Sequence, residues 1–371
     1  SVDDLNQTAI IGELALDGLV RPVAGALPIA LGAREAGMLR AMVPSDNGPE
    51  AAVVNDFEVY GADNLYDAVR MLEEGFLCEP ETVTPEALDL DAAQYEVDFA
   101  DVKGQEHVKR ALEVASAGGH NLLMIGPPGS GKTMLARRMP TILPPMTFEE
   151  ALEVTKLYSV SGLMPKKTAL IRTRPFRSPH HTVSTAGLVG GGSIPRPGEI
   201  SLAHNGVLFL DELPEFGQNT LEVLRQPLED GIVTIARAQI ALTFPANFQM
   251  VASMNPCPCG FRGDSARECT CTQTLVAKYL KRISGPLQDR IDIQVEVPSV
   301  RYQDLASLER GESSTAIRER VAVARGRQTE RFKSARKTHC NAGMRPRELQ
   351  KYCRLPPAAQ EQIKTAITEL N

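Results

Sequence analysis

Residues 126–133 constrain the fold of this chain more than any other segment. They read Gly-Pro-Pro-Gly-Ser-Gly-Lys-Thr, which matches the phosphate-loop pattern of a glycine, four residues and then Gly-Lys-Thr. An apolar run at 121–125 precedes the loop and a helical pattern at 134–138 follows it. A chance glycine turn would not explain this context. We therefore predict a strand, loop and helix that bind the phosphates of ATP through backbone N–H groups and the positive end of the helix.

Two residues of the loop have predicted roles of their own. Lys132 is expected to meet the β- and γ-phosphates, because the pattern places its ammonium group over them. Thr133 is expected to hold Mg²⁺ through its hydroxyl group. ATP and Mg²⁺ are therefore the predicted cofactors of this part of the chain.

Polar residues also end two later apolar runs. Residues 207–210 lead to Asp211 and Glu212, and residues 249–254 lead to Asn255. In an open α/β sheet these ends lie beside the phosphate loop. We predict that Asp211 holds Mg²⁺, that Glu212 polarises the attacking water, and that Asn255 bonds the γ-phosphate or that water. The alternative for the acidic pair is a strand that simply ends in solvent. The predicted nucleotide-binding residues are Gly126, Pro127, Pro128, Gly129, Ser130, Gly131, Lys132, Thr133 and Asp211.

Arg290 is the third predicted catalytic residue, after Glu212 and Asn255. It lies in a Gln-Asp-Arg-Ile-Asp stretch that comes just before another apolar run, residues 291–297. We predict an arginine finger, which reaches the γ-phosphate bound by a neighbouring subunit. The alternative is a surface ion pair with Asp289 or Asp292.

Four of the seven cysteines lie within residues 257–271. They form two Cys-x-Cys pairs with nine residues between them. In a large chain such clustering indicates a metal rather than disulfides. Four thiolates suit tetrahedral Zn²⁺ and leave no open position, so the predicted role is structural. The alternative is four free thiols in a polar loop. The predicted ligands are Cys257, Cys259, Cys269 and Cys271.

Composition limits the class of protein. The chain has 371 residues, 43% hydrophobic and 23% charged, which is ordinary for a soluble protein of two or three domains. No run approaches the length of a membrane span, and the first residues lack the basic region of a signal peptide. Cytoplasmic localisation is the resulting expectation.

The net charge is −6, so any nucleic-acid surface must be local. Basic residues occur in an insert at 172–181, in a predicted hairpin at 231–244 and in the helix after the cysteines. The insert precedes a glycine-rich tract at 187–192, which could line a central channel. The alternative for these residues is a solvated charged face. The predicted DNA contacts are Arg177, His181, Arg237, Lys278 and Lys281.

The chain divides into three predicted units. The first is 1–95, and it ends in an acidic, proline-bearing linker at 78–94. An ATPase core is predicted at 96–300 and a helical lid at 301–371. The main predicted helices are 27–37, 65–75, 107–117 and 316–331, and the predicted strands include a pair within 12–23, then 41–44 and 51–54.

The order of the strand-ending acids, the asparagine and the Asp-Arg pair resembles AAA+ ATPases. The insert at 174–182 is similar to that of the magnesium-chelatase-like branch, and the stretches 197–214 and 254–260 look like the YifB/ComM family of competence proteins. The resemblance covers nearly the whole chain. It implies an α/β AAA+ sheet with flanking helices, a helical lid and an N-terminal Lon-like α+β domain. It also implies hexameric rings that act as DNA helicases on single-stranded or branched DNA, driving branch migration in natural transformation.

Residues 12–44 resemble the C-terminal half of the proteolytic domain of Lon-type proteases. Aligned on Pro22 and Gly25, the catalytic lysine of that family falls on Leu27 here. The resemblance implies a Lon-like fold without proteolysis, and a chain that begins within this domain.

Two other functions of the whole chain stay open. One is an ATPase that remodels a partner protein, as the motor subunits of metal chelatases do. The other is a nucleotide-dependent structural module, against which Glu212 argues.

Overall fold

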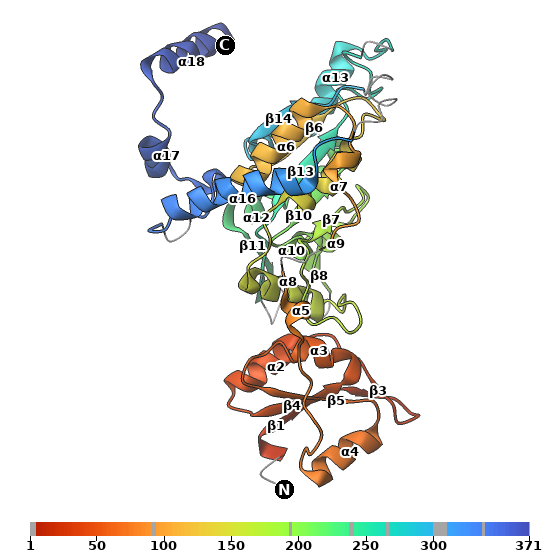
Figure 1. Ribbon diagram of the computed structural model, residues 1–371. Helices are drawn as coiled ribbons and strands as arrows, with labels where there is room; N and C mark the ends of the chain where they lie inside the picture. The colour runs from red at the N-terminus through yellow and green to blue at the C-terminus, as the bar shows by residue number, and fades with distance from the viewer. Residues whose placement is uncertain are drawn as a thin grey trace.

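The computed structural model describes residues 5–90, 94–192, 195–236, 241–264, 267–299, 310–335 and 338–370. The molecule is elongated (Figure 1). A small N-terminal unit lies at one end, a larger α/β body makes up the rest, and the last two helices of the chain project from one side of that body. Among the described residues no helix is both long and apolar enough to cross a bilayer.

The N-terminal unit is built on a parallel sheet in the order β1-β4-β5. A hairpin of β2 and β3 turns at Asp17 and Gly18, as predicted, and the predicted first two helices are present. The predicted strand at 51–54 is wrong, because a helical turn with Pro49 near its start covers Gly48–Ala51 and a turn follows it. The elements are β1 (Thr8–Ile10), β2 (Glu13–Leu14), β3 (Val20–Arg21), α2 (Ala26–Glu35), β4 (Arg40–Pro44), η1 (Ser45–Asn47), α3 (Gly48–Ala51), β5 (Glu58–Ala62) and α4 (Leu65–Glu74).

The predicted linker is irregular except for one helical turn, α5 (Pro85–Leu88). It does not separate two independent cores. Leu27 and Val43 of the N-terminal unit share one hydrophobic cluster with Val154 of α8 (Phe148–Val160) and with Leu170. The N-terminal unit is therefore packed directly against the body of the protein.

The body contains a five-stranded parallel sheet in the order β14-β6-β13-β10-β7. Alternate residues of each strand face opposite sides, so Leu122 and Phe209 enter one apolar cluster while Leu123 and Leu208 enter the other. Helices thus cover both faces, which explains why the strands are apolar throughout. This architecture confirms the predicted α/β class. The strands are β6 (Leu122–Ile125), β7 (Phe176–Arg177), β10 (Val207–Leu210), β13 (Gln249–Met254) and β14 (Ile293–Glu296).

Three helices pack on one face of this sheet, and one of them, α16, comes from the C-terminal region. The helices of that face are α6 (Glu106–Gly118), α7 (Lys132–Ile142) and α16 (Ser314–Arg331). The other elements of the body are η2 (Phe99–Asp101), α9 (Thr185–Val189), β8 (Gly190–Gly191), β9 (Arg196–Pro197), α10 (Glu199–Leu202), η3 (Leu213–Glu215), α11 (Gln218–Glu222), α12 (Arg225–Asp230), β11 (Ile232–Ala236), β12 (Ala241–Pro245), α13 (Gln273–Leu280) and α14 (Gly285–Gln288).

The basic insert contributes to the sheet, which the sequence did not predict. Its residues Phe176 and Arg177 form the edge strand β7, parallel to β10. The glycine tract is partly ordered, since Gly190 and Gly191 pair with β9. A side chain at Gly190 would lie 2.3 Å from the carbonyl oxygen of Arg196, so only glycine allows this pairing. The insert therefore adds an edge strand to the sheet, and residues 178–184 after it are turns and irregular chain. A channel-lining role for this region stays a prediction.

The C-terminal region is helical, as predicted. After α16 come η4 (Asn341–Gly343), α17 (Pro346–Tyr352) and α18 (Pro357–Leu370). Proline begins both α17 and α18, where a missing N–H group is tolerated. Figure 1 shows these two helices extending away from the sheet.

Candidate nucleotide site and metal centre

The phosphate loop joins β6 to α7, as the motif predicts. Gly129 and Gly131 have φ angles of 78° and 86°, which side-chain-bearing residues rarely adopt. The N–H group of Gly126 donates to the carbonyl oxygen of Met254, 3.1 Å away, and so ties the loop to the end of β13. The loop is thus held at the carboxyl edge of the sheet, where β6, β10 and β13 end side by side.

Lys132 lies inside the loop, and only 8% of it is exposed. Its ammonium group donates to the carbonyl oxygens of Gly126 at 2.7 Å and Pro127 at 2.9 Å. Burial lowers the pKa of Lys132, while the charges of Asp211 and Glu212 oppose that shift. The ammonium group is therefore placed where it can exchange carbonyl oxygens for phosphate oxygens.

The predicted Mg²⁺ ligands lie in contact. The hydroxyl group of Thr133 donates to Oδ2 of Asp211 over 2.8 Å. The hydroxyl group of Ser253 donates to the other oxygen, Oδ1. A hydroxyl and a carboxylate oxygen are hard oxygen donors of the kind that Mg²⁺ accepts. Sequence reasoning missed Ser253, whose only signal is a small polar residue inside an apolar strand.

Glu212 follows at once, with a left-handed backbone at φ 55°. Its N–H group donates to Oδ1 of Asp211 at 3.1 Å and to the hydroxyl group of Ser253 at 3.3 Å. These bonds fix the backbone, while 55% of the side chain stays exposed. Nδ1 of His181 lies 3.5 Å from Oε2 of Glu212. His181, a predicted DNA contact, therefore lies beside the predicted catalytic carboxylate.

Asn255 directly follows β13 and lies next to the phosphate loop. Its Oδ1 atom lies 3.4 Å from Nζ of Lys132. Tyr279 of α13 contacts the backbone of Asn255, and burial raises the pKa of that phenol to about 12. The amide group is thus at the phosphate end of the site, as predicted from its place after an apolar strand.

Arg290 lies at the opposite end of the sheet. It comes before β14, whose Ile293 pairs in parallel with Leu122 at the start of β6. Its guanidinium group pairs with Glu229 rather than with Asp289 or Asp292. Since the phosphate loop follows the other end of β6, Arg290 does not reach the nucleotide site of its own chain.

The four clustered cysteines converge. Their sulfur atoms all lie within 4.8 Å of one another, and Cys269 is 3.7 Å from both Cys257 and Cys259. Four sulfurs at about 2.3 Å from one Zn²⁺ ion would lie about 3.8 Å apart. Hydrogen bonds from the backbone N–H groups of Phe261 and Thr270 lower the pKa of Cys259 to about 6. Burial and the neighbouring cysteines raise the pKa of Cys269 and Cys271, so the geometry of the four sulfurs, and not their pKa values, supports a metal. The set, completed by Cys271, fits one tetrahedral Zn²⁺ ion.

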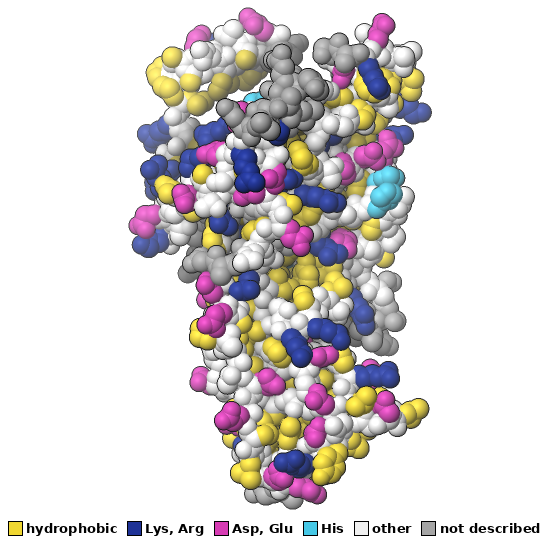
Figure 2. Space-filling model, turned by 45° about the vertical axis from the view of Figure 1, so that its right-hand side comes forward, with side chains coloured by type: hydrophobic (Ala, Val, Ile, Leu, Met, Phe, Trp, Pro, Cys, Tyr) yellow, Lys and Arg dark blue, Asp and Glu magenta, His cyan; other side chains and the backbone are white. Residues whose placement is uncertain are grey.

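The predicted DNA contacts are scattered. Arg177 makes two bonds to Glu199, from Nε at 2.6 Å and from the terminal nitrogen at 2.7 Å. Lys278 and Lys281 are exposed on and just after α13. Arg237 lies outside the described residues. Figure 2 shows acidic and basic side chains interspersed on the face in view rather than a continuous basic band.

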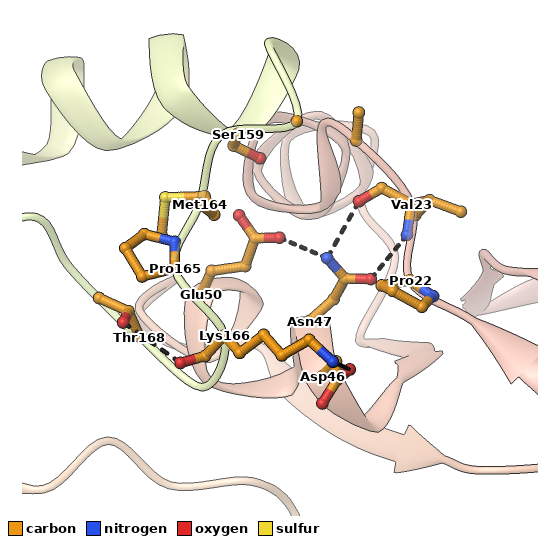
Figure 3. A pocket seen from close by; sticks show the side chains of 12 residues that line it. Pro22, Val23, Asp46, Asn47, Glu50, Ser159, Met164, Pro165, Lys166 and Thr168 are labelled. Atoms are coloured by element: carbon orange, nitrogen blue, oxygen red, sulfur yellow. Dashed lines mark hydrogen bonds and ion pairs between the residues drawn. The ribbon is translucent and has the colours of Figure 1, made fainter.

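A separate cavity of about 230 Å³ lies between the N-terminal unit and the segment after α8 (Figure 3). Asn47 bonds both backbone groups of Val23, at 2.9 and 3.0 Å, and donates to Glu50 at 2.6 Å. Burial raises the pKa of Glu50. Leu27, where the Lon resemblance would place a lysine, is fully buried in the core. The polar groups here hold the turn before α2 in place, and sequence reasoning missed them.

Comparison with known proteins agrees with this geometry. The profile of the family "Magnesium chelatase, subunit ChlI" matches residues 98–305, and profiles of the ChlI C-terminal region and of subunit ChlI match 311–371 and 1–47. YifB of Salmonella typhimurium is 44% identical over 95% of this chain and 67% of its own length. Competence protein ComM of Haemophilus influenzae is 43% identical over 95% of this chain and 68% of its own length.

The chain belongs to the YifB/ComM family of magnesium-chelatase-like AAA+ proteins. An uncharacterized protein of Mycobacterium tuberculosis is 44% identical over 89% of the chain, which covers 64% of that relative. This YifB/ComM chain thus spans about two thirds of the length of the relatives it matches. The family confirms the resemblance on which an AAA+ ATPase was predicted.

Proposed function

We propose that this YifB/ComM chain is part of a ring-forming motor that hydrolyses ATP and moves DNA. The observation that carries the ATPase part is the contact of Thr133 with Asp211, with Lys132 and Glu212 at the same sheet edge. This set can bind a magnesium nucleotide and activate a water molecule. A purely structural nucleotide module would not need Glu212.

Each residue of the nucleotide site has a separate proposed role in hydrolysis. Lys132 orients the terminal phosphates, while Thr133 and Asp211 hold Mg²⁺, which neutralises the charge that develops on phosphate oxygens. Glu212 accepts the proton of the attacking water, and Asn255 orients that water or the γ-phosphate. Ser253 fixes the carboxylate of Asp211 and so keeps it directed at Thr133.

The place of Arg290 supports ring assembly. An arginine finger at this position is too far from the nucleotide of its own chain and would act on that of a neighbour. We propose a head-to-tail ring of six subunits in which each Arg290 completes the next site. Exchange of Glu229 for a phosphate partner would accompany that contact.

DNA is the proposed substrate because a relative named competence protein matches nearly the whole chain. Single-stranded or branched DNA would contact Lys278 and Lys281, with His181, Arg177 and Arg237 as further proposed contacts, and branch migration in natural transformation is the proposed task. The second candidate is remodelling of a partner protein, which the magnesium chelatase profile favours.

The test is ATP hydrolysis by the full-length protein with and without single-stranded and branched DNA. We expect DNA to raise the turnover number severalfold, more so for the branched form. A rate that DNA leaves unchanged, in a ring that hydrolyses ATP, would support the remodelling function instead.

We also propose one structural Zn²⁺ ion per chain, bound by the four clustered thiolates. The sulfur spacing fits a single ion, and none of the seven cysteines is in a disulfide. Elemental analysis should give one zinc per chain. Cys271→Ser should reduce that content, and iron in place of zinc would refute the assignment.

A further inference from the structure

The loop that carries the four cysteines touches the phosphate loop. A Cβ atom added at Gly260 would lie 2.6 Å from Cδ and 2.8 Å from Cγ of Pro128. The backbone of Gly260 has a φ of 86°, and its N–H group donates to the carbonyl oxygen of Cys257 at 2.9 Å. A tight turn that begins at a metal ligand is therefore packed directly on a residue of the nucleotide site.

The same loop also begins at the nucleotide site. Asn255, 3.4 Å from Lys132, precedes the fully buried Cys257 by only two residues. Between β13 and α13 the described residues form only turns and irregular chain. Their conformation therefore depends on what holds the four sulfurs together, because no helix or strand does so.

We infer that the four-cysteine loop forms one wall of the ATP site, so that metal bound there controls nucleotide affinity. This inference rests on the proposed zinc centre. Metal fixes Cys257 and the turn at Gly260, and that turn supports Pro128 and restricts the phosphate loop to its binding shape. Without metal the four-cysteine loop becomes more mobile, and the phosphate loop loses its support. Ordering both loops when ATP binds then costs conformational entropy, which weakens nucleotide affinity.

Two glycines in this loop provide a matched pair of variants. Gly260 and Gly263 both have positive φ angles, 86° and 78°, so alanine strains the backbone at either position. A side chain at Gly263 would meet nothing within 4 Å, whereas one at Gly260 would strike Pro128. Only Gly260→Ala therefore disturbs the contact with the phosphate loop.

The experiment measures the dissociation constant of a fluorescent ATP analogue with Mg²⁺ present. The full-length protein is compared before and after a zinc-selective chelator, and again after Zn²⁺ is restored. We expect removal of zinc to weaken binding roughly tenfold and its return to reverse the loss. Gly260→Ala should weaken binding similarly with zinc still bound, and Gly263→Ala should stay within about twofold of wild type.

A further variant covers the case in which Gly260→Ala fails to fold. Pro128→Ala removes the ring atoms that face Gly260, so the cysteine loop no longer presses on the phosphate loop. This variant should therefore reduce the effect of zinc on the dissociation constant. Protein without stoichiometric metal would refute the zinc centre itself. Bound zinc whose removal leaves the dissociation constant unchanged, or equal effects of Gly260→Ala and Gly263→Ala, would refute the coupling alone.

Discussion

Replacing Arg177 by alanine should destabilise the fold rather than only weaken DNA binding. Arg177 is on the edge strand β7 and makes a two-point contact with Glu199 of α10. The two side chains are only 28% and 23% exposed. The hydrogen bonds to Glu199 raise the pKa of Arg177, so the guanidinium group stays charged under all usual conditions.

The expected loss can be estimated from this geometry. Removing one partner of a buried, hydrogen-bonded charge pair costs about 3–5 kcal/mol, and an exposed pair contributes about 1 kcal/mol or less. For a partly buried pair with two bonds we expect Arg177→Ala to cost about 3 kcal/mol. In a body of this size about 1 kcal/mol shifts Tm by about 2–4 °C, so Tm should fall by about 6–12 °C.

Thermal unfolding of Arg177→Ala, Glu199→Ala and the double variant tests this reasoning. The double variant should lose less than the sum of the single variants, with a coupling energy of about 2 kcal/mol. Lys278→Ala, at an exposed position on α13, is the control and should leave Tm unchanged. Unchanged stability of Arg177→Ala, together with a salt slope of DNA binding reduced by about 0.7, would show that Arg177 contacts phosphate instead.

Four further outcomes are expected. Glu212→Gln should bind ATP with wild-type affinity but lose turnover in a steady-state assay; normal turnover would contradict its role. Arg290→Ala should lower turnover about 10³-fold or more, and mixing it with Glu212→Gln subunits should restore some activity if the finger acts between subunits. His181→Ala should lower kcat about tenfold at unchanged KM, because Glu212 then loses its side-chain contact, while His180→Ala should not. Burial keeps the pKa of His204 below its usual value, so this histidine takes up a proton more readily in the unfolded chain than in the folded one. Stability should therefore fall as pH drops below about 6.5. In thermal unfolding, His204→Gln should reduce this dependence of Tm on pH.

The nucleotide site was predictable because each of its parts is local in sequence. A phosphate loop fixes its own backbone, and the residues after apolar strands meet at one edge of a parallel sheet. Thr133 and Asp211 are far apart in the chain, yet they are in contact because both follow the carboxyl ends of strands in the same parallel sheet. The four cysteines converge for a similar reason, since two short pairs are joined by a short loop.

Contacts that depend on tertiary pairing could not be read in the same way. The edge strand β7 has only two residues, too short for an apolar pattern, yet it decides where the insert lies. Through it Arg177 meets Glu199 and His181 meets Glu212. The false strand at 51–54 has the opposite cause, because a short apolar run does not distinguish a buried strand from a buried helical turn.

The arrangement of the sheet also limits how copies of this chain can share a site. Arg290 precedes β14 and the phosphate loop follows β6, so the full length of two paired strands separates them. Four residues of strand span about 13 Å, more than an arginine side chain reaches. A two-fold dimer would have to include both ends of the sheet in a single interface to complete two sites. A head-to-tail contact joins one end of one chain to the other end of the next, and repeating it around the proposed closed ring would bring each Arg290 to a neighbouring site.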